Sequence, residues 1–350
     1  MAMNRDSSHN KGRGSGWRGA MAAICGLAVT AALAILGLGA MDGDRAAAQA
    51  PTKLDFGGSV TWIGQVPIMT AIEKGYFKDE GLDVEFKIIL TSYDRIAALT
   101  AGSLAFSNLG RVAVISEMAR GNKSFYYFAN IDDSPGSEGC WARPGVASVK
   151  DLKGKKVAGN SSAEITFHGL LRANGMSIRD VTYLNLPPNE MAGALSKGDV
   201  DAACVWQPLL DGLRTAVPTG ALLGTDKDTD IYAKFKTMAS PDIVIVSRKI
   251  VDEHPEQAKK LARALLKGAD FAIANPEETA KLVAKYFKKE PSEVLAGMKT
   301  FAYFGSKNWP EHMKLHTGQM QYLSDWLFDA GKTQSKIDVT QWEKTSFIDK

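Results

Sequence analysis

The sequence predicts an α/β protein built from two doubly wound lobes. Strand and helix patterns alternate at helix-sized intervals along most of the chain, which is typical of sheets covered by helices on both faces. One helix, glycine, strand pattern occurs twice, as ALTAGSLAFSNLG at 98–110 and as ALSKGDVDAACVW at 194–206. The 300 residues after position 50 are too many for one ordinary domain and suit two lobes of similar size.

Residues 1–50 are predicted to be a signal peptide rather than part of the fold. Basic residues lie among the first 18 positions, an uncharged apolar stretch covers 20–40, and Ala48, Gln49 and Ala50 form an A-x-A cleavage pattern. We therefore expect cleavage near Ala50. Because the apolar stretch is long enough to span a bilayer, an uncleaved anchor stays open as the alternative.

The first round of elements runs from 53 to 131. The apolar patterns predict strands at 53–64, 81–90, 104–110 and 124–131, with helices at 66–75, 93–102 and 112–121. Pro67 opens the first of these helices and Gly75 closes it. This order predicts a doubly wound parallel sheet.

The second round begins near Ser148 and is followed by an almost wholly helical region. We expect strands at 155–160, 181–186, 199–206 and 240–248, and helices at 161–175 and 189–198. Four further helices are predicted at 255–275, 276–287, 291–301 and 310–331. Each of the four starts with proline, which suits the first helical position.

Two such lobes joined by strands place a ligand site between them. Ligands of open α/β sheets bind outside the carboxyl ends of strands. The segments 108–111 and 206–208 are both strand ends of this kind. Trp206 is therefore expected to be held by the second sheet and aimed across the cleft, while Pro208 stops the strand ladder.

Composition excludes several classes of partner. After removal of the first 50 residues, 37 basic side chains face 36 acidic ones. That balance gives no electrostatic case for binding nucleic acid or an anionic membrane surface, and no nucleic-acid motif spacing occurs.

No metal or cofactor is predicted either. His312 and His316 lie four residues apart on a helix, but Met313 removes the HExxH pattern, so both are expected to be solvated. Cys140 and Cys204 are expected to be small buried thiols with no bridge between them.

Several segments together resemble the periplasmic substrate-binding proteins of ABC importers, in the nitrate, sulfonate and taurine group. The resemblance covers roughly 55–345 and is carried by KGYFKDEGLDVEF, AALTAGSLAFSNLG, VKDLKGKKVAGN, ALSKGDVDAACVWQP and VSRKIVDEHPEQAKKLARAL. Within the group it is most similar to taurine-binding proteins, through SNLG, the pair Ser137 and Glu138, LNLPP, VWQP, and Asp242 ahead of VIVSRK.

The resemblance implies the type II periplasmic-binding-protein fold, with two crossover strands. Lobe 1 would comprise 51–142 plus 244–350, and lobe 2 would comprise 143–243. The protein would be a monomeric, periplasmic carrier that closes its lobes on a small ligand. Its partners would be an ABC permease and the ATPase of that permease, and it would meet the membrane only through the permease.

The site residues are predicted by chemistry and resemblance together. Ser161 and Ser162 at a helix start would bind an acid group, with Arg111 as a further donor. Glu138 and Asp242 would share a ligand ammonium, and Trp206 and Tyr93 would wall the pocket. The complete predicted set is Gln65, Tyr93, Asn108, Gly110, Arg111, Glu138, Ser161, Ser162, Trp206 and Asp242.

Ordinary roles stay open for several of these residues. The two serines could be simple helix caps, Arg111 an exposed surface residue, Glu138 a solvated loop residue, Asp242 a turn cap and Trp206 part of a core. Arg111, Tyr93 and the segment SSAE at 161–164 also depart from the taurine pattern, which leaves the ligand open.

The predicted function is capture of a small amino-sulfonate such as taurine for import. Alternatives within the carrier role are a cationic guanidinium or amine, and a simple alkanesulfonate. An enzyme resembling thiamin-pyrimidine synthase is the alternative of a different class. That enzyme chemistry relies on a cysteine-rich segment and iron, so we do not expect it here.

Overall fold

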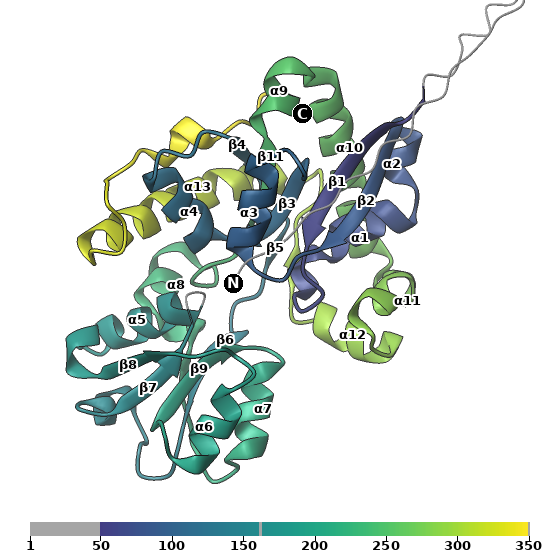
Figure 1. Ribbon diagram of the computed structural model, residues 1–350. Helices are drawn as coiled ribbons and strands as arrows, with labels where there is room; N and C mark the ends of the chain where they lie inside the picture. The colour runs from purple at the N-terminus through teal and green to yellow at the C-terminus, as the bar shows by residue number, and fades with distance from the viewer. Residues whose placement is uncertain (1–49, 161–162, 349–350) are drawn as a thin grey trace, which may run out of the picture. The chain divides into compact units, whose positions relative to one another are not determined.

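A computed structural model describes residues 50–160 and 163–348. These residues form two five-stranded sheets with helices packed on them, and one two-stranded ladder (Figure 1). The predicted α/β class is thereby confirmed. Apart from Ala50, the predicted signal peptide lies outside the described residues. Within the described ranges, no helix is both long and apolar enough to cross a bilayer.

The first sheet has the strand order β2-β1-β3-β11-β4. Its strands are β1 (Thr52–Gly58), β2 (Leu82–Ile88), β3 (Phe106–Gly110), β4 (Phe125–Ala129) and β11 (Asp242–Ser247). The neighbouring helices are α1 (Val66–Glu73), α2 (Tyr76–Asp79), α3 (Ser92–Thr100), α4 (Arg111–Ala119), α9 (Arg248–Glu253), α10 (Pro255–Ala274) and α13 (Trp309–Asp329). The 3-10 turn η5 (Val339–Trp342) follows α13 and packs its Val339 and Trp342 side chains into the same core.

The second sheet has the order β10-β6-β9-β7-β8. Its strands are β6 (Glu138–Ala142), β7 (Lys156–Gly159), β8 (Thr182–Asn185), β9 (Ala202–Trp206) and β10 (Ala221–Thr225). Its helices are α5 (Ala163–Ala173), α6 (Met191–Lys197), α7 (Leu209–Ala216) and α8 (Asp230–Phe235), with the 3-10 turns η2 (Val149–Leu152), η3 (Ile178–Asp180) and η4 (Asp226–Asp228).

Both sheets are mixed: the four strands of the first round, β1 to β4, are parallel to one another as predicted, and β11 runs antiparallel between β3 and β4. In the second sheet β6 is antiparallel to β9 and β10. The physical reason is the connection: β6 and β11 each enter from the other sheet, so no helical crossover forces them to run parallel.

Sheet membership locates where the chain passes between the sheets. β6 already belongs to the second sheet and β11 to the first. The two crossing segments are therefore 134–137 and 237–241, a few residues before the predicted lobe boundaries. The division into two lobes itself stays a proposal.

A third group of elements flanks the first sheet. The ladder pairs β5 (Asp132–Asp133) with β12 (Ala302–Tyr303), which are antiparallel. The 3-10 turn η1 (Ile63–Gln65), α11 (Pro276–Phe287) and α12 (Pro291–Met298) complete the group. Ile63 packs against the buried cluster that α1, α10, α11 and α12 form together.

Two close approaches hold the core of the first sheet together. Phe56 on β1 lies with its ring centre 5.4 Å from Phe86 and 5.0 Å from Phe106. On the helical side, a Cβ added at Gly268 of α10 would lie 2.4 Å from the Pro67 carbonyl oxygen. Glycine at 268 therefore allows α10 to pack directly on α1.

The structure contains a disulfide bond between Cys140 and Cys204, so the prediction of two separate thiols is wrong. The two cysteines are direct partners in the register of β6 and β9, with Cα atoms 4.0 Å apart. Composition alone could not reveal this, because the pairing depends on which strand lies beside β6. The bond closes a loop of 64 residues within the second sheet.

We predict that the exported protein has no reactive thiol at 140 or 204 and that the bond stabilises the second sheet. Replacing both cysteines by alanine should lower the free energy of unfolding by about 2–4 kcal/mol, as expected for a long closed loop. Urea unfolding of the parent, with and without reductant, measures the same quantity. A parent protein that titrates two thiols under denaturing, non-reducing conditions would contradict the bond.

Candidate functional site

The crossing segments and their neighbours bring five carboxylates together. Asp132 and Asp133 lie on β5, Glu138 begins β6, Asp226 begins η4 and Asp242 begins β11. Asp242 is half-buried and the other four are buried. Carboxylates at such depth are costly unless hydrogen bonds or opposite charges offset the loss of hydration.

Two of the five acids bind the backbone of the crossing segments. Asp133 Oδ1 accepts hydrogen bonds from the N–H groups of Ser134 and Met238, at 2.9 and 3.0 Å. Asp133 thereby joins one crossing segment to the other. Asp226 Oδ1 accepts from the N–H groups of Gly136 and Glu138, at 2.8 and 3.3 Å.

Glu138 and Asp242, the predicted ammonium-binding pair, start strands of different sheets and influence each other electrostatically. Thr166 Oγ1 donates to Glu138 Oε2 at 2.5 Å, and Asn108 Nδ2 donates to Asp242 Oδ2 at 3.3 Å. Burial raises the pKa of Glu138 to about 8, and the nearby charges of Asp226 and Asp242 add to that rise. Burial also raises the pKa of Asp242, while Arg95 and Arg111 oppose the rise.

Arg111 is fully buried at the start of α4, so its interpretation as an exposed surface residue is wrong. Its guanidinium donates to Gln319 Oε1 and contacts His316 Nδ1 at 2.6 Å. Burial lowers the pKa of Arg111 to about 10, and Asp133, Asp132 and Asp242 oppose that change. Arg111 therefore remains charged at neutral pH and offsets part of the acidic cluster.

The expectation that both histidines are solvated is wrong for His316, which has no exposed surface. Burial and the adjacent Arg111 charge hold its pKa well below the usual value, so the ring is neutral and Nδ1 can accept from Arg111. His312 instead stacks on Phe304, with ring centres 3.6 Å apart.

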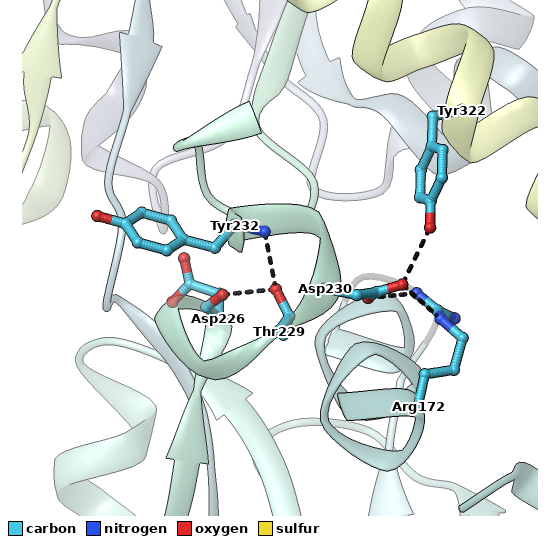
Figure 2. A network of polar contacts seen from close by, with 6 residues as sticks. All are labelled: Arg172, Asp226, Thr229, Asp230, Tyr232 and Tyr322. Carbon is cyan, nitrogen blue, oxygen red and sulfur yellow. Dashed lines mark hydrogen bonds and ion pairs between the residues drawn. The ribbon is translucent and has the colours of Figure 1, made fainter. Parts of the chain in front are cut away.

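The turn that carries Asp226 also links α13 to the second sheet (Figure 2). Thr229 Oγ1 donates to the Asp226 carbonyl oxygen at 2.6 Å and accepts from the Tyr232 N–H at 3.2 Å. Asp230 accepts two bonds of 2.8 Å from Arg172 on α5 and one of 3.0 Å from the Tyr322 hydroxyl on α13. The position of Asp226 is therefore tied to both α5 and α13.

The structure groups some of the predicted site residues and separates others. Asp242 pairs with Gly110 across the β3 and β11 ladder, and Glu138 pairs with Trp206 across β6 and β9. Trp206 is half-buried at the end of β9. Gln65 is buried in η1 and accepts from the Ser59 N–H at 2.9 Å.

Tyr93 lies apart from this group. Its side chain is 41% exposed at the start of α3, with the Arg120 guanidinium 5.9 Å from its ring centre. Ser161 and Ser162 lie outside the described residues. The roles proposed for all these residues in ligand binding stay predictions.

Sequence reasoning missed four polar residues of the cluster, Arg95, Asp132, Asp133 and Asp226. The segment NIDDSPGSEG held a usable signal, because two adjacent acids follow two residues after the apolar run FYYFA. Arg95 sits within an amphipathic helix pattern, yet its Nη1 donates to the Asn108 carbonyl oxygen at 2.7 Å. Nothing in its sequence context distinguishes it from a surface arginine.

Two cavities lie away from the acidic cluster. One of about 520 Å³ lies between the start of α13 and the segment 343–348. The other, of about 250 Å³, lies between α5, η3 and the end of α13. Among the described side chains, no group of three or more His, Cys, Asp or Glu residues is arranged to hold a metal ion.

The family model described as NMT1/THI5 like matches residues 62–279, and the chain belongs to this family. A Bacillus subtilis protein with the provisional name aliphatic sulfonates-binding protein is 28% identical over 295 residues, or 81% of this chain and 84% of that protein. The taurine-binding periplasmic protein of Escherichia coli is 25% identical over 206 residues, or 58% and 61%. The predicted family resemblance is thereby confirmed.

One relative is named as an enzyme. The 4-amino-5-hydroxymethyl-2-methylpyrimidine phosphate synthase of Saccharomyces cerevisiae is 25% identical over 272 residues, covering 71% of this chain and 75% of the yeast protein. The relatives thus include proteins named for binding and a protein named for catalysis.

A solved structure confirms the predicted fold. The periplasmic aliphatic sulphonate-binding protein SsuA of Escherichia coli matches with a TM-score of 0.67 at 17% identity, covering 83% of this chain and 92% of that chain. The fold is that of the periplasmic binding proteins.

We predict that the stability of the ligand-free protein falls as pH rises from about 5 to 8. Glu138, Asp226 and Asp133 have pKa values raised to about 8, 7 and 6, chiefly by burial. The folded state therefore binds more protons than the unfolded state in this window, and the stabilisation is lost as these acids ionise. Urea unfolding at several pH values measures the slope.

Glu138→Gln should flatten this slope and raise stability at pH 8, by on the order of 1–3 kcal/mol. The exposed Asp79→Asn serves as the matched control and should keep the parent slope. Equal slopes for the parent and Glu138→Gln would show that Glu138 ionises normally.

Proposed function

We propose that this protein is the periplasmic substrate-binding component of an ABC importer and that its cargo is a small organic molecule bearing a nitrogen cation. An amino-sulfonate such as taurine is the leading candidate. Family membership and the relatives named for sulfonate and taurine binding support the carrier role. The predicted signal peptide and the Cys140–Cys204 bond fit an exported protein.

The observation that carries the proposal is the proximity of Glu138 and Asp242. They start strands of different sheets, and both belong to a buried cluster in which carboxylates outnumber guanidinium groups. A ligand ammonium between them would offset the cost of ionising both. It would also draw the two sheets toward one ligand, which is how we expect closure at segments 134–137 and 237–241 to be driven.

The remaining parts of the proposed site follow from the expected chemistry of an amino-sulfonate. Its acid group would bind at the start of α5, where Ser161 and Ser162 precede Ala163. Trp206 would cover the carbon chain. A monomeric carrier would then deliver the cargo to the permease and its ATPase.

A cationic amine or guanidinium is the second candidate cargo, and the same carboxylates favour it. A simple alkanesulfonate fits less well, because it offers nothing to balance Glu138 and Asp242. The enzyme alternative gains no support from the cysteines, since both described cysteines are joined in a disulfide.

A ligand screen tests the carrier role directly. The exported protein should melt at a higher temperature with one of taurine, alkanesulfonates, nitrate, guanidine or thiamin pyrimidines. A ligand present at 100 times its Kd adds about 2.7 kcal/mol of stability. Small-angle scattering with and without a saturating hit should then differ, because closure makes the molecule more compact. No shift with any compound would count against this cargo class.

We predict that Glu138→Gln and Asp242→Asn each weaken binding of the identified cargo by about 2–5 kcal/mol, mainly through faster release. Removing one carboxylate takes away half of the charge that balances the ligand nitrogen. Trp206→Ala should cost about 2 kcal/mol. Calorimetry measures all three variants.

Glu256→Gln is the control for these variants, because Glu256 lies on the exposed surface of α10. It should bind as tightly as the parent. If both site variants also bind as tightly as the parent, the cargo is not read through these carboxylates and a simple anion becomes the better candidate.

A further inference from the structure

Asp132 is the most unusual group of the acidic cluster. Its side chain has no exposed surface, and neither of its carboxylate oxygens has a hydrogen bond of ordinary length and angle, while the Asn108 side chain lies close enough to lower the pKa of Asp132. Asp133 and Asp226, in contrast, each hold two backbone N–H groups. Because a buried, unpaired carboxylate lowers stability, a folded chain that keeps one has a reason outside its own packing.

Two more unpaired polar atoms belong to residues that adjoin this carboxylate. Trp62 Nε1 is a buried donor without an acceptor, and Asn108 Oδ1 is a buried acceptor without a donor. A Cβ added at Gly64 would lie 2.2 Å from Asp132 Oδ2 and 2.3 Å from Trp62 Nε1, so both atoms adjoin the same point. The amide of Asn108 is directed to Asp242 Oδ2, at 3.3 Å.

The nearest guanidinium is also engaged elsewhere. Arg111 influences Asp132 electrostatically, but its Nη1 donates to Gln319 and its Nη2 contacts His316. The neighbouring charges of Asp242 and Asp133 are negative and make ionisation of Asp132 harder. The surroundings of Asp132 therefore call for a donor that carries positive charge.

A row of aromatic rings leads from Trp62 to the strand that pairs with Asp132. Trp62 packs edge-on against Phe301, with ring centres 5.0 Å apart, and Phe301 stacks on Tyr303 at 5.9 Å. Tyr303 is the direct partner of Asp132 in the β5 and β12 ladder, and its hydroxyl donates to the Ile63 carbonyl oxygen at 3.1 Å. A carboxylate beside aromatic rings is a common way to bind a nitrogen cation.

We propose that Asp132, together with Trp62 and Asn108, binds a nitrogen group of the cargo that carries at least two N–H donors, such as an ammonium, amidinium or guanidinium. One oxygen of Asp132 and Oδ1 of Asn108 each accept one N–H group, which leaves the third N–H of an ammonium for the pair Glu138 and Asp242. Trp62 Nε1 donates to an acceptor on the cargo. This assignment rests on the proposed carrier function and names the chemistry that its cargo presents.

Access requires a local movement, because the oxygens of Asp132 have no open surface in this state. Trp62 is half-buried and directly precedes η1, so it is the neighbour of Asp132 through which we propose that the cargo gains access. Gly64 is required for close packing, since a Cβ at this position would overlap Asp132 Oδ2 and Trp62 Nε1.

The test compares three ligands that share one acid group. Ethanesulfonate has no nitrogen, taurine has an ammonium, and 2-guanidinoethanesulfonate has a guanidinium. Calorimetry with the exported parent protein should give at least about 30-fold tighter binding of one nitrogen ligand than of ethanesulfonate, as expected for a desolvated charge pair. Asp132→Asn should remove that preference while leaving ethanesulfonate binding within about threefold of the parent.

Gly64→Ala should also lose the nitrogen ligands, because its Cβ overlaps Asp132 Oδ2 and Trp62 Nε1 and displaces both groups. Gly193→Ala is the matched control, since a Cβ at Gly193 in α6 meets nothing within 4 Å. This control should bind all three ligands as the parent does. Ligand-free Asp132→Asn should melt at a higher temperature than the parent, because it removes an unpaired carboxylate.

Failure of this assignment differs from failure of the carrier proposal. If the parent binds the ligands and Asp132→Asn keeps the preference for nitrogen, the assignment is overturned and the carrier role stands. A parent that binds all three ligands equally overturns it as well. If the parent binds none of them, the amino-sulfonate proposal fails, and the melting experiment decides the role of Asp132: a lower melting temperature for Asp132→Asn marks it as structural.

Discussion

Burial of acid where the chain passes between its two sheets is the constraint on which the rest of the site depends. Five carboxylates gather there, and two guanidiniums, Arg95 and Arg111, act on them electrostatically. Backbone N–H groups hold Asp133 and Asp226, which fixes the crossing segments in place. Among the described contacts, the carboxylates of Asp132, Glu138 and Asp242 accept no backbone N–H, and they lie on the β5 ladder, the second sheet and the first sheet respectively, so we propose these three acids for the ligand.

Contacts of the helix α13 support the acidic cluster, although none of the five carboxylates lies on α13. Gln319 on α13 binds Arg111 through its oxygen and binds Thr237 and Met238 through its nitrogen, at 2.7 and 2.8 Å. Tyr322 reaches Asp230 on the other sheet's helix α8. One face of α13 therefore supports both the buried cation and a crossing segment, so a movement at the crossing must also alter contacts of α13.

Local patterns in the sequence predicted most helices and strands, but they could not predict which distant segments pair with each other. Proline at the first turn marked α10, α11 and α12, and the helix, glycine, strand repeat marked β3 and β9. The Cys140–Cys204 bond depends on the register of β6 against β9. The burial of Asp132 depends on β12, whose Tyr303 pairs with it. The depth of Arg111 likewise depends on α13, which no pattern around 111 reveals.

The excess of carboxylates in the cluster also constrains the charge of the cargo, which similarity of fold does not. A match at 17% identity to a sulphonate-binding protein fixes the arrangement of the chain, while the ligand is selected by a few side chains. An anionic cargo beside Glu138, Asp132 and Asp242 would require these acids to stay protonated, since like charges at short range are unfavourable. A nitrogen cation would instead favour their ionised forms and release protons on binding. Glu138, with a pKa raised to about 8, is mostly protonated at neutral pH, whereas Asp242, with a pKa of about 6, is mostly ionised, so a bound cation would change the charge of Glu138 most.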